Sequence, residues 1–138
     1  MVFLSILNQV KKNVSKIIEE KGYDRVGFVV EPSKGGFGDI TCNVAFLLAK
    51  SLKKSPQEIA QEFAGAYDTS QSKELNKVEA HQSGYLNFFL DANSFNKAVL
   101  LESQKENYGS IDIGKNSKVI VEHTSVNPNK ALHIGHLR

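Results

Sequence analysis

The stretch Lys77-Val78-Glu79-Ala80-His81-Gln82-Ser83-Gly84-Tyr85-Leu86-Asn87-Phe88-Phe89-Leu90 decides the fold. Residues 77–81 alternate between polar and apolar side chains, which predicts a strand, and residues 85–90 predict a second one. The polar, glycine-containing segment between them is typical of a short turn. We therefore expect the two strands to pair as an antiparallel hairpin.

The second predicted strand has one ordinary face and one unusual face. Because side chains alternate along a strand, the two faces are Leu86, Phe88 and Leu90 on one side, and Tyr85, Asn87 and Phe89 on the other. The first set suits a core. In the second set, aromatic rings flank an amide, a combination that can stack on unpaired RNA bases and hydrogen-bond to them. Alternatively, helices cover both faces and the rings are core. The residues alone leave both interpretations open.

A helix and a strand are predicted ahead of the hairpin. Apolar residues with helical spacing predict a helix that ends at Lys21-Gly22. The stretch Val26–Glu31 predicts a strand closed by Pro32. The apolar stripe of the helix consists of Phe3, Ile6, Leu7, Val10, Val14, Ile17 and Ile18.

Residues 32–39 form a glycine-rich loop. Such a loop ahead of a helix can cradle a phosphate, but its spacing and its lysine do not match the known phosphate-binding fingerprints. We therefore expect a flexible turn that sets the next helix on the sheet. Asp39 or Thr41 is expected to cap that helix, and Cys42 is expected inside it as a small apolar residue.

A further helix has clear start signals. Ser55 suits the N-cap, Pro56 the first turn, and Glu58 the closing position of a capping box. The polar run over residues 68–76 is expected to be a loop. After the hairpin, the segment Asp91–Ser94 predicts the cap of a last helix.

That last helix is expected to end at Tyr108-Gly109, and the polar segment that follows is a candidate domain boundary. Beyond it, Val119–Glu122 is a short apolar run that predicts a buried strand. Such a strand needs neighbours on both sides. We therefore expect it to pair with another chain or to be loosely held, and full burial within one compact monomer would contradict this.

Composition excludes several classes of protein. A chain of 138 residues with 41% hydrophobic residues suits one domain with its own core. A net charge of +2 permits a nucleic-acid partner without requiring one. No apolar run predicts a membrane span, and no secretory signal is recognised. The single cysteine rules out an internal disulfide and fits a cytoplasmic location. No zinc-binding spacing is present, so no protein metal site is expected.

Residues 122–138, Glu-His-Thr-Ser-Val-Asn-Pro-Asn-Lys-Ala-Leu-His-Ile-Gly-His-Leu-Arg, resemble the nucleotide-binding motif of class I aminoacyl-tRNA synthetases. More narrowly, the sequence of this segment is similar to the motif of archaeal arginyl-tRNA synthetases. His-x-Gly-His alone is a weak pattern, but Ser125, Asn127 and Lys130 at these offsets, together with Glu122, make it specific. The resemblance extends through the rest of the chain.

The resemblance implies roles for the motif residues. It implies that His133, His136 and Lys130 are catalytic and stabilise the growing charge on the phosphates. It implies that ATP is bound by His133, Gly135 and His136, with Mg²⁺ held through ATP. It implies that arginine is bound by Glu122, Ser125, Asn127 and His133, with Glu122 facing the guanidinium.

The resemblance also favours the RNA interpretation of the hairpin. Tyr85 and Asn87 match positions that recognise a base in the D-loop of tRNA in this family. Tyr85 would stack on the base and Asn87 would bond to its edge. Phe89 is expected to support them or to enter the core, and His81 to be an ordinary exposed histidine.

The whole chain is therefore expected to be α/β, with an accessory domain of the α+β type. This domain spans residues 1–109 and has a small, mainly antiparallel sheet with packed helices. A linker covers 110–117, and 118–138 are the truncated start of a Rossmann-type catalytic domain. The parent protein is expected to be a cytoplasmic, monomeric arginine-tRNA ligase with tRNA(Arg), arginine and ATP as partners and no membrane contact.

The activity of the fragment is expected to be limited to D-loop binding. The alternatives are a non-catalytic tRNA-binding module and a truncated paralogue with a regulatory or scaffolding role.

Overall fold

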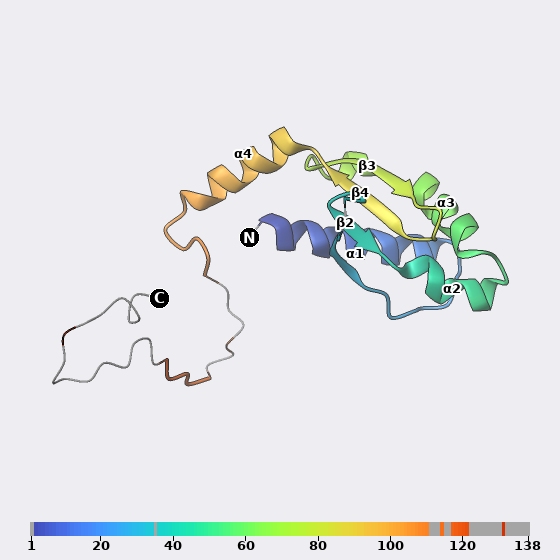
Figure 1. Ribbon diagram of the computed structural model, residues 1–138, viewed down its shortest axis with the longest axis horizontal. Helices are drawn as coiled ribbons and strands as arrows, with labels where there is room; N and C mark the ends of the chain where they lie inside the picture. Colours follow the sequence, from blue (N-terminus) through green and yellow to red (C-terminus); the bar gives the residue numbers. More distant parts are fainter. Residues whose placement is uncertain (1, 35, 111–113, 115–116, 122–130, 132–138) are drawn as a thin grey trace.

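A computed structural model describes residues 2–34, 36–110, 114, 117–121 and 131. In this part of the chain, helices pack on a four-stranded antiparallel sheet with the strand order β1-β2-β4-β3. Figure 1 shows the helices around this sheet, with β2, β4 and β3 labelled. The predicted small antiparallel sheet with packed helices is confirmed. The elements are α1 (Val2–Glu20), β1 (Val30–Pro32), β2 (Ile40–Cys42), α2 (Val44–Leu52), α3 (Pro56–Ala66), a 3₁₀ turn (Thr69–Gln71), β3 (Leu75–Ala80), β4 (Leu86–Leu90) and α4 (Ala92–Ser103).

The strand register sorts the side chains onto two faces. Ile40 of β2 lies opposite Phe88 of β4, and Thr41 lies opposite Asn87. On its other side, Asn87 lies opposite Glu79 of β3. Directly paired residues of antiparallel strands point to the same face. One face therefore carries large apolar side chains, and the other carries a row of polar ones.

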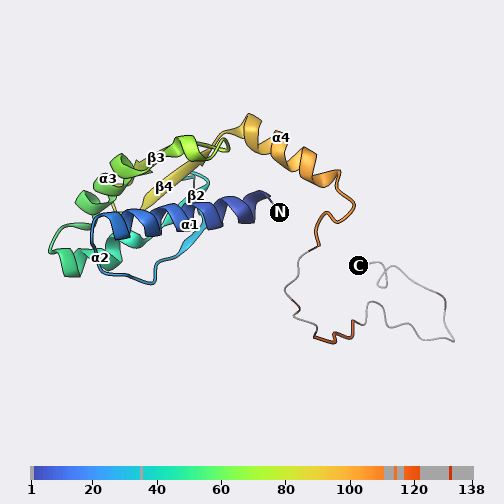
Figure 2. The same cartoon turned by 180° about the vertical axis from the view of Figure 1, so that it is seen from behind.

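In the part of the chain that the structure describes, α1, α2 and α3 pack on the apolar face of the sheet. Figure 2 shows α1 lying in front of the sheet and crossing β4 at an oblique angle. Burying apolar side chains between these layers contributes about 25 cal/mol per Å². Tyr85, on the other face, is 40% exposed, so among the described residues it is not a plain core residue. The buried core includes Ile6, Val10 and Val14 of α1, Val44 and Leu48 of α2, Ile59 and Phe63 of α3, and Ile40, Cys42, Leu86 and Phe88 of the sheet.

Helix α3 begins with the predicted capping box. The Glu58 N–H donates to Ser55 Oγ at 3.2 Å, and the Ser55 N–H donates to Glu58 Oε2 at 2.9 Å. The turn between β3 and β4 lies against this helix start. Gly84 has φ +94°, and a Cβ added there would lie 2.5 Å from Pro56 Cβ. Only glycine fits this approach, so Gly84 couples the hairpin to α3.

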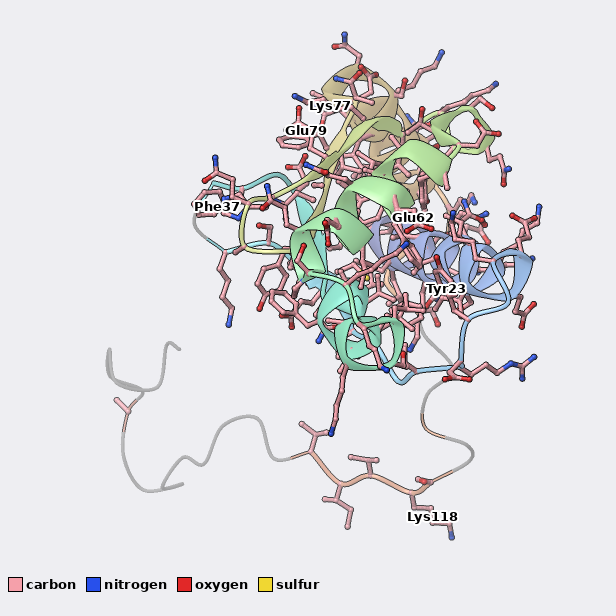
Figure 3. All side chains as sticks on the ribbon, turned by 90° about the vertical axis from the view of Figure 1, so that its right-hand side faces the viewer. Tyr23, Phe37, Glu62, Lys77, Glu79 and Lys118 are labelled. Atoms are coloured by element: carbon pink, nitrogen blue, oxygen red, sulfur yellow. The ribbon has the colours of Figure 1, made fainter. Side chains whose placement is uncertain are left out.

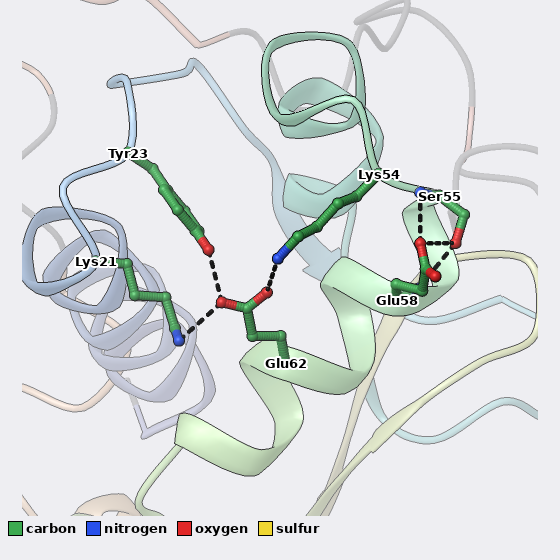
Figure 4. A network of polar contacts seen from close by, with 6 residues as sticks. All are labelled: Lys21, Tyr23, Lys54, Ser55, Glu58 and Glu62. Carbon is green, nitrogen blue, oxygen red and sulfur yellow. Dashed lines mark hydrogen bonds and ion pairs between the residues drawn. The ribbon is translucent and has the colours of Figure 1, made fainter.

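A polar network joins the end of α1 to α3 on the covered side of the molecule (Figure 4). The Tyr23 hydroxyl donates to Glu62 Oε1 at 2.6 Å. Lys21 Nζ and Lys54 Nζ approach the two oxygens of Glu62 at 2.9 and 3.1 Å. The hydrogen bond from Tyr23, followed by that from Lys21, lowers the pKa of Glu62 from its ordinary value of 4.5 to about 2.

Strand β1 is shorter and later than predicted. It covers Val30–Pro32 rather than Val26–Glu31, because its partner β2 has only three residues. Residues 26–29 have no ladder partner and form no strand. As an edge strand, β1 tolerates Pro32, which lacks an N–H donor.

The expected helix cap after the glycine-rich loop is wrong. Residues Ile40–Cys42 form strand β2, so neither Asp39 nor Thr41 caps α2, which begins after Asn43. Cys42 lies in the strand instead of the helix, and its burial raises the pKa of its thiol to about 12. A three-residue segment is too short for the alternation of a strand to be recognised in the sequence. In the structure, pairing with β1 and β4 holds this segment extended.

Two other expected boundaries differ. The region 68–76 contains a 3₁₀ turn and the first residues of β3. Helix α4 ends at Ser103, before the expected end at Tyr108. None of its residues is buried, so tertiary packing does not extend it. None of the described helices is long and apolar enough to cross a membrane.

The strand expected over residues 119–122 is not formed over Val119–Val121. Ile120 is 98% exposed. A strand forms only with a hydrogen-bonding partner, and no described residue pairs with this segment. Glu122 lies outside the described residues.

Candidate functional site

A cavity of about 300 Å³ opens on the uncovered face of the sheet. It lies where β1, β2 and the loop between them meet the end of the hairpin. Tyr85 and Asn87, the two residues predicted from the sequence to bind RNA, both line this cavity, so the fold brings them together. The full lining is Glu31, Pro32, Ser33, Lys34, Phe37, Thr41, His81, Ser83, Tyr85 and Asn87.

Asn87 is the hydrogen-bonding group at the base of the cavity. Its residue is only 5% exposed, and its Oδ1 accepts a hydrogen bond from Thr41 Oγ1 at 3.2 Å. In the described part of the chain, no group accepts a hydrogen bond from Asn87 Nδ2. The amide can therefore offer its N–H donors to a ligand.

Tyr85 is an aromatic wall of the cavity. Its residue is 40% exposed, and its ring packs against Phe46 of α2 with a centroid distance of 4.8 Å and an interplanar angle of 63°. This edge-to-face contact fixes the plane of the Tyr85 ring. A flat ligand would thus meet a ring that is already oriented for stacking.

A second aromatic pair lies on the rim of the cavity. Phe37 is 54% exposed, and its ring lies 4.9 Å from that of His81 at an angle of 64°. The Ser83 N–H donates to His81 Nδ1 at 3.2 Å, and Ser83 Oγ lies 2.6 Å from the same nitrogen. Figure 3 shows Phe37 at the edge of the molecule, on the side away from Tyr23.

The glycine-rich loop is anchored at its end rather than simply flexible. The Asp39 N–H donates to the Phe88 carbonyl at 2.9 Å, and the Leu90 N–H donates to Asp39 Oδ2 at 2.8 Å. Gly38 has φ +86°, and a Cβ added there would lie 3.0 Å from the Phe88 carbonyl oxygen. The loop leads into β2, and the helix expected directly after it is absent. It supplies Ser33, Lys34 and Phe37 to the cavity.

The sequence analysis did not identify Phe37, Lys34, Glu31 or Thr41 as site residues. The signal for Phe37 was present, because a single large aromatic residue among glycines has no periodic apolar partner in the sequence. Thr41 and Glu31 gave no signal, because their place on the open face follows only from the strand register.

Phe89 lies beside the cavity and does not line it. Lys77 Nζ lies 4.4 Å from the centroid of its ring and also contacts Glu79 at 2.7 Å. Phe89 is therefore on the open face, partly covered by Lys77, in a supporting position. His81, expected to be an ordinary exposed histidine, lines the cavity and holds Phe37.

A depression of about 650 Å³ between α1 and α4 is larger. None of the described residues that line it is aromatic, so they offer no ring on which a base could stack. Among the described residues, no group of three or more histidine, cysteine or acidic side chains could hold a metal ion. The residues predicted for ATP and arginine lie outside the described part of the chain, namely Glu122, Ser125, Asn127, Lys130, His133, Gly135 and His136.

Comparisons of the sequence with protein families and with known proteins point to the same family. Residues 5–90 match the family described as "Arginyl tRNA synthetase N terminal domain". Over 132 residues, or 93% of the chain, the sequence is 44% identical to an arginine–tRNA ligase of Thermococcus sibiricus and covers 20% of that protein. An arginine–tRNA ligase of Pyrococcus furiosus is 43% identical over 97% of the chain, which covers 22% of that protein.

A solved structure shares the fold. The arginyl-tRNA synthetase of Thermus thermophilus superposes with a TM-score of 0.54 and 31% sequence identity, over 95% of this chain and 21% of that one. The chain thus spans about a fifth of the length of the proteins that it resembles.

Proposed function

The chain belongs to the arginyl-tRNA synthetase N-terminal domain family, and from this premise we propose that it binds tRNA(Arg) by taking one unpaired D-loop base into the cavity of Tyr85 and Asn87. The observation that carries the proposal is the meeting of an oriented, exposed ring with an amide whose Nδ2 donors have no acceptor in the described part of the chain.

Each wall of the cavity has a distinct task in this proposal. Tyr85 stacks on the base, a contact that is worth about 1–3 kcal/mol and tolerates any base. Asn87 donates to an acceptor on the base edge and supplies the discrimination between bases. Phe37, held by His81, closes the opposite rim. Lys34 supplies a positive charge to the nucleotide's phosphate.

We further infer that the parent protein is an arginine-tRNA ligase, which joins arginine to tRNA(Arg) with ATP in the cytoplasm. This rests on the relatives, of which the chain covers about a fifth, and on the resemblance of residues 122–138 to the family's nucleotide motif. His133, His136 and Lys130 are proposed to act on ATP, with Gly135 at the nucleotide, and Glu122, Ser125 and Asn127 on arginine. A stand-alone tRNA-binding module would use the same cavity.

The test is binding of a tRNA(Arg) transcript to the 138-residue chain, measured by fluorescence anisotropy at two salt concentrations. Tyr85→Ala and Asn87→Ala are each expected to raise Kd by about tenfold, because each removes a contact to the base. Asn76→Ala is the matched control, since Asn76 is an exposed asparagine of β3 outside the cavity. Equal Kd values for wild type and both cavity variants would refute the proposal.

A further inference from the structure

We infer that Thr41 is a positioning residue of this site: its hydroxyl holds the amide of Asn87 so that the two Nδ2 protons face the ligand. The inference rests on the proposed function and adds to it a residue that decides specificity without contacting the base. It starts from the 3.2 Å hydrogen bond between Thr41 Oγ1 and Asn87 Oδ1.

The positions of the two residues in the sheet make this contact rigid. Thr41 and Asn87 are direct cross-strand partners on β2 and β4, so their side chains lie next to each other on the open face. Thr41 is β-branched and has few χ1 choices, whereas the terminal torsion of an asparagine is broad and nearly two-fold. Without a fixed partner, the Asn87 amide would therefore present either its oxygen or its nitrogen to the cavity.

The acidic neighbours decide which end of the amide faces which way. A hydroxyl both donates and accepts, so Thr41 alone would allow either orientation. However, Glu31 lies opposite Thr41, and Glu79 lies opposite Asn87, in one row across the four strands. Turning the amide oxygen away from Thr41 would point it toward β3, where Glu79 is the direct cross-strand partner of Asn87 and carries an acceptor-only carboxylate that also holds Lys77 at 2.7 Å. The charges of this row therefore favour Oδ1 toward Thr41 and the N–H end toward the acidic side and the cavity.

The consequence concerns selectivity more than affinity. With the amide fixed, the site rewards an acceptor on the base edge and penalises a donor at the same place. If the Thr41 hydroxyl is lost, the amide can turn, while stacking on Tyr85 is retained. Base discrimination is then expected to weaken and much of the overall affinity to remain.

The experiment compares Thr41→Val, which keeps the side-chain shape, with Thr41→Ser, which keeps the hydroxyl. Each is titrated with a tRNA(Arg) transcript and with transcripts in which each unpaired D-loop base is replaced in turn. For the native transcript, Thr41→Val is expected to raise Kd about threefold to tenfold, the worth of one hydrogen bond. It should also bring the ratio of Kd values for substituted and native transcripts closer to 1. Thr41→Ser should keep both values within about twofold of wild type.

Asn87→Ala and Asn87→Asp are measured in parallel. Asn87→Asp keeps an oxygen for Thr41 but removes the donors, so it should weaken binding as much as Asn87→Ala. The role of Thr41 would be overturned if Asn87→Ala weakened binding but Thr41→Val left the Kd ratio between native and substituted transcripts unchanged. It would also be overturned if Thr41→Ser reduced this ratio as much as Thr41→Val. If Asn87→Ala left Kd unchanged, the proposed function itself would fail. Thermal unfolding of each variant shows that the fold is intact.

Discussion

Two consecutive residues of β4, Asn87 and Phe88, are almost equally buried and serve opposite faces of the sheet. Phe88 is fully buried beneath the helices, while Asn87 is 5% exposed and faces the cavity. The Nδ2 donors of Asn87 reach the cavity, and among the described residues no fully buried side-chain nitrogen or oxygen lacks a hydrogen-bond partner. The comparison shows that burial alone does not identify a core residue. The side chains of the covered face stabilise the fold, whereas those of the open face are available to bind a ligand.

The largest expected effect comes from the covered face. Phe88→Ala should lower the free energy of unfolding by about 3–5 kcal/mol, because it leaves a cavity among closely packed side chains. Asn87→Ala should lower it by no more than about 1 kcal/mol. Urea unfolding followed by circular dichroism measures both values. Equal losses in the two variants would mean that the faces do not differ as described.

The next effect tests the turn that joins the two faces to α3. Gly84→Ala should lower the free energy of unfolding by about 1–3 kcal/mol, because its φ of +94° disfavours a side chain and the new Cβ would clash with Pro56. Gly27→Ala is the matched control, since a Cβ there meets nothing within 4 Å. A Gly84→Ala protein as stable as the Gly27→Ala protein would show that the turn does not press on α3.

A smaller, pH-dependent effect belongs to the covered side. The folded pKa of Glu62, about 2, lies below its ordinary value of 4.5, so its contribution to stability is present above pH 4.5 and is lost as the pH falls toward 2. Glu62→Gln should therefore cost about 1 kcal/mol near neutral pH, a value reduced for solvent screening, since the side chain is 27% exposed. Denaturant unfolding should show that the difference in unfolding free energy between wild type and Glu62→Gln disappears as the pH falls toward 2.

Tyr23→Phe provides the control for that measurement. It removes the hydrogen bond that contributes most to the lowered pKa of Glu62, so the folded pKa should rise, and the loss of stability in acid, which still begins near pH 4.5, should be smaller and complete at a higher pH. A pH-independent difference between wild type and Glu62→Gln would show that the carboxylate has an ordinary pKa in the folded chain.

The smallest effect concerns the charge on the open face. Lys34→Ala should weaken binding of the tRNA(Arg) transcript and reduce the slope of log Kd against log salt by about 1, as expected for one phosphate contact. Lys11→Ala, on the exposed side of α1 and outside the cavity, is the control and should leave the slope unchanged. Identical slopes for Lys34→Ala and wild type would remove Lys34 from the interface.

The sequence was informative where a local pattern is repeated. The hairpin faces followed from period-two alternation over residues 85–90, and the start of α3 followed from the chemistry of Ser55 and Glu58. Both signals are contained within a few neighbouring residues. The sequence therefore predicted the sheet type and placed Tyr85 and Asn87 on one face.

Features that depend on contacts distant in sequence could not be predicted. Strand β2 is only three residues long and is held by partners that lie elsewhere in the chain, so its pattern was mistaken for a helix start. The cross-strand contact of Thr41 with Asn87 links residues 46 positions apart. Phe37 joins the site only because Asp39 anchors its loop to β4.

A double-mutant cycle tests the central claim most directly. Wild type and Asn87→Ala are each titrated with the tRNA(Arg) transcript and with transcripts that lack one unpaired D-loop base. The account predicts that, for one particular base, the loss of binding on its removal is about tenfold smaller in Asn87→Ala than in wild type, because the contact to Asn87 is already gone and only the stacking on Tyr85 remains to be lost. If the two losses simply add for every D-loop position, Asn87 does not contact a D-loop base and the proposed function is wrong.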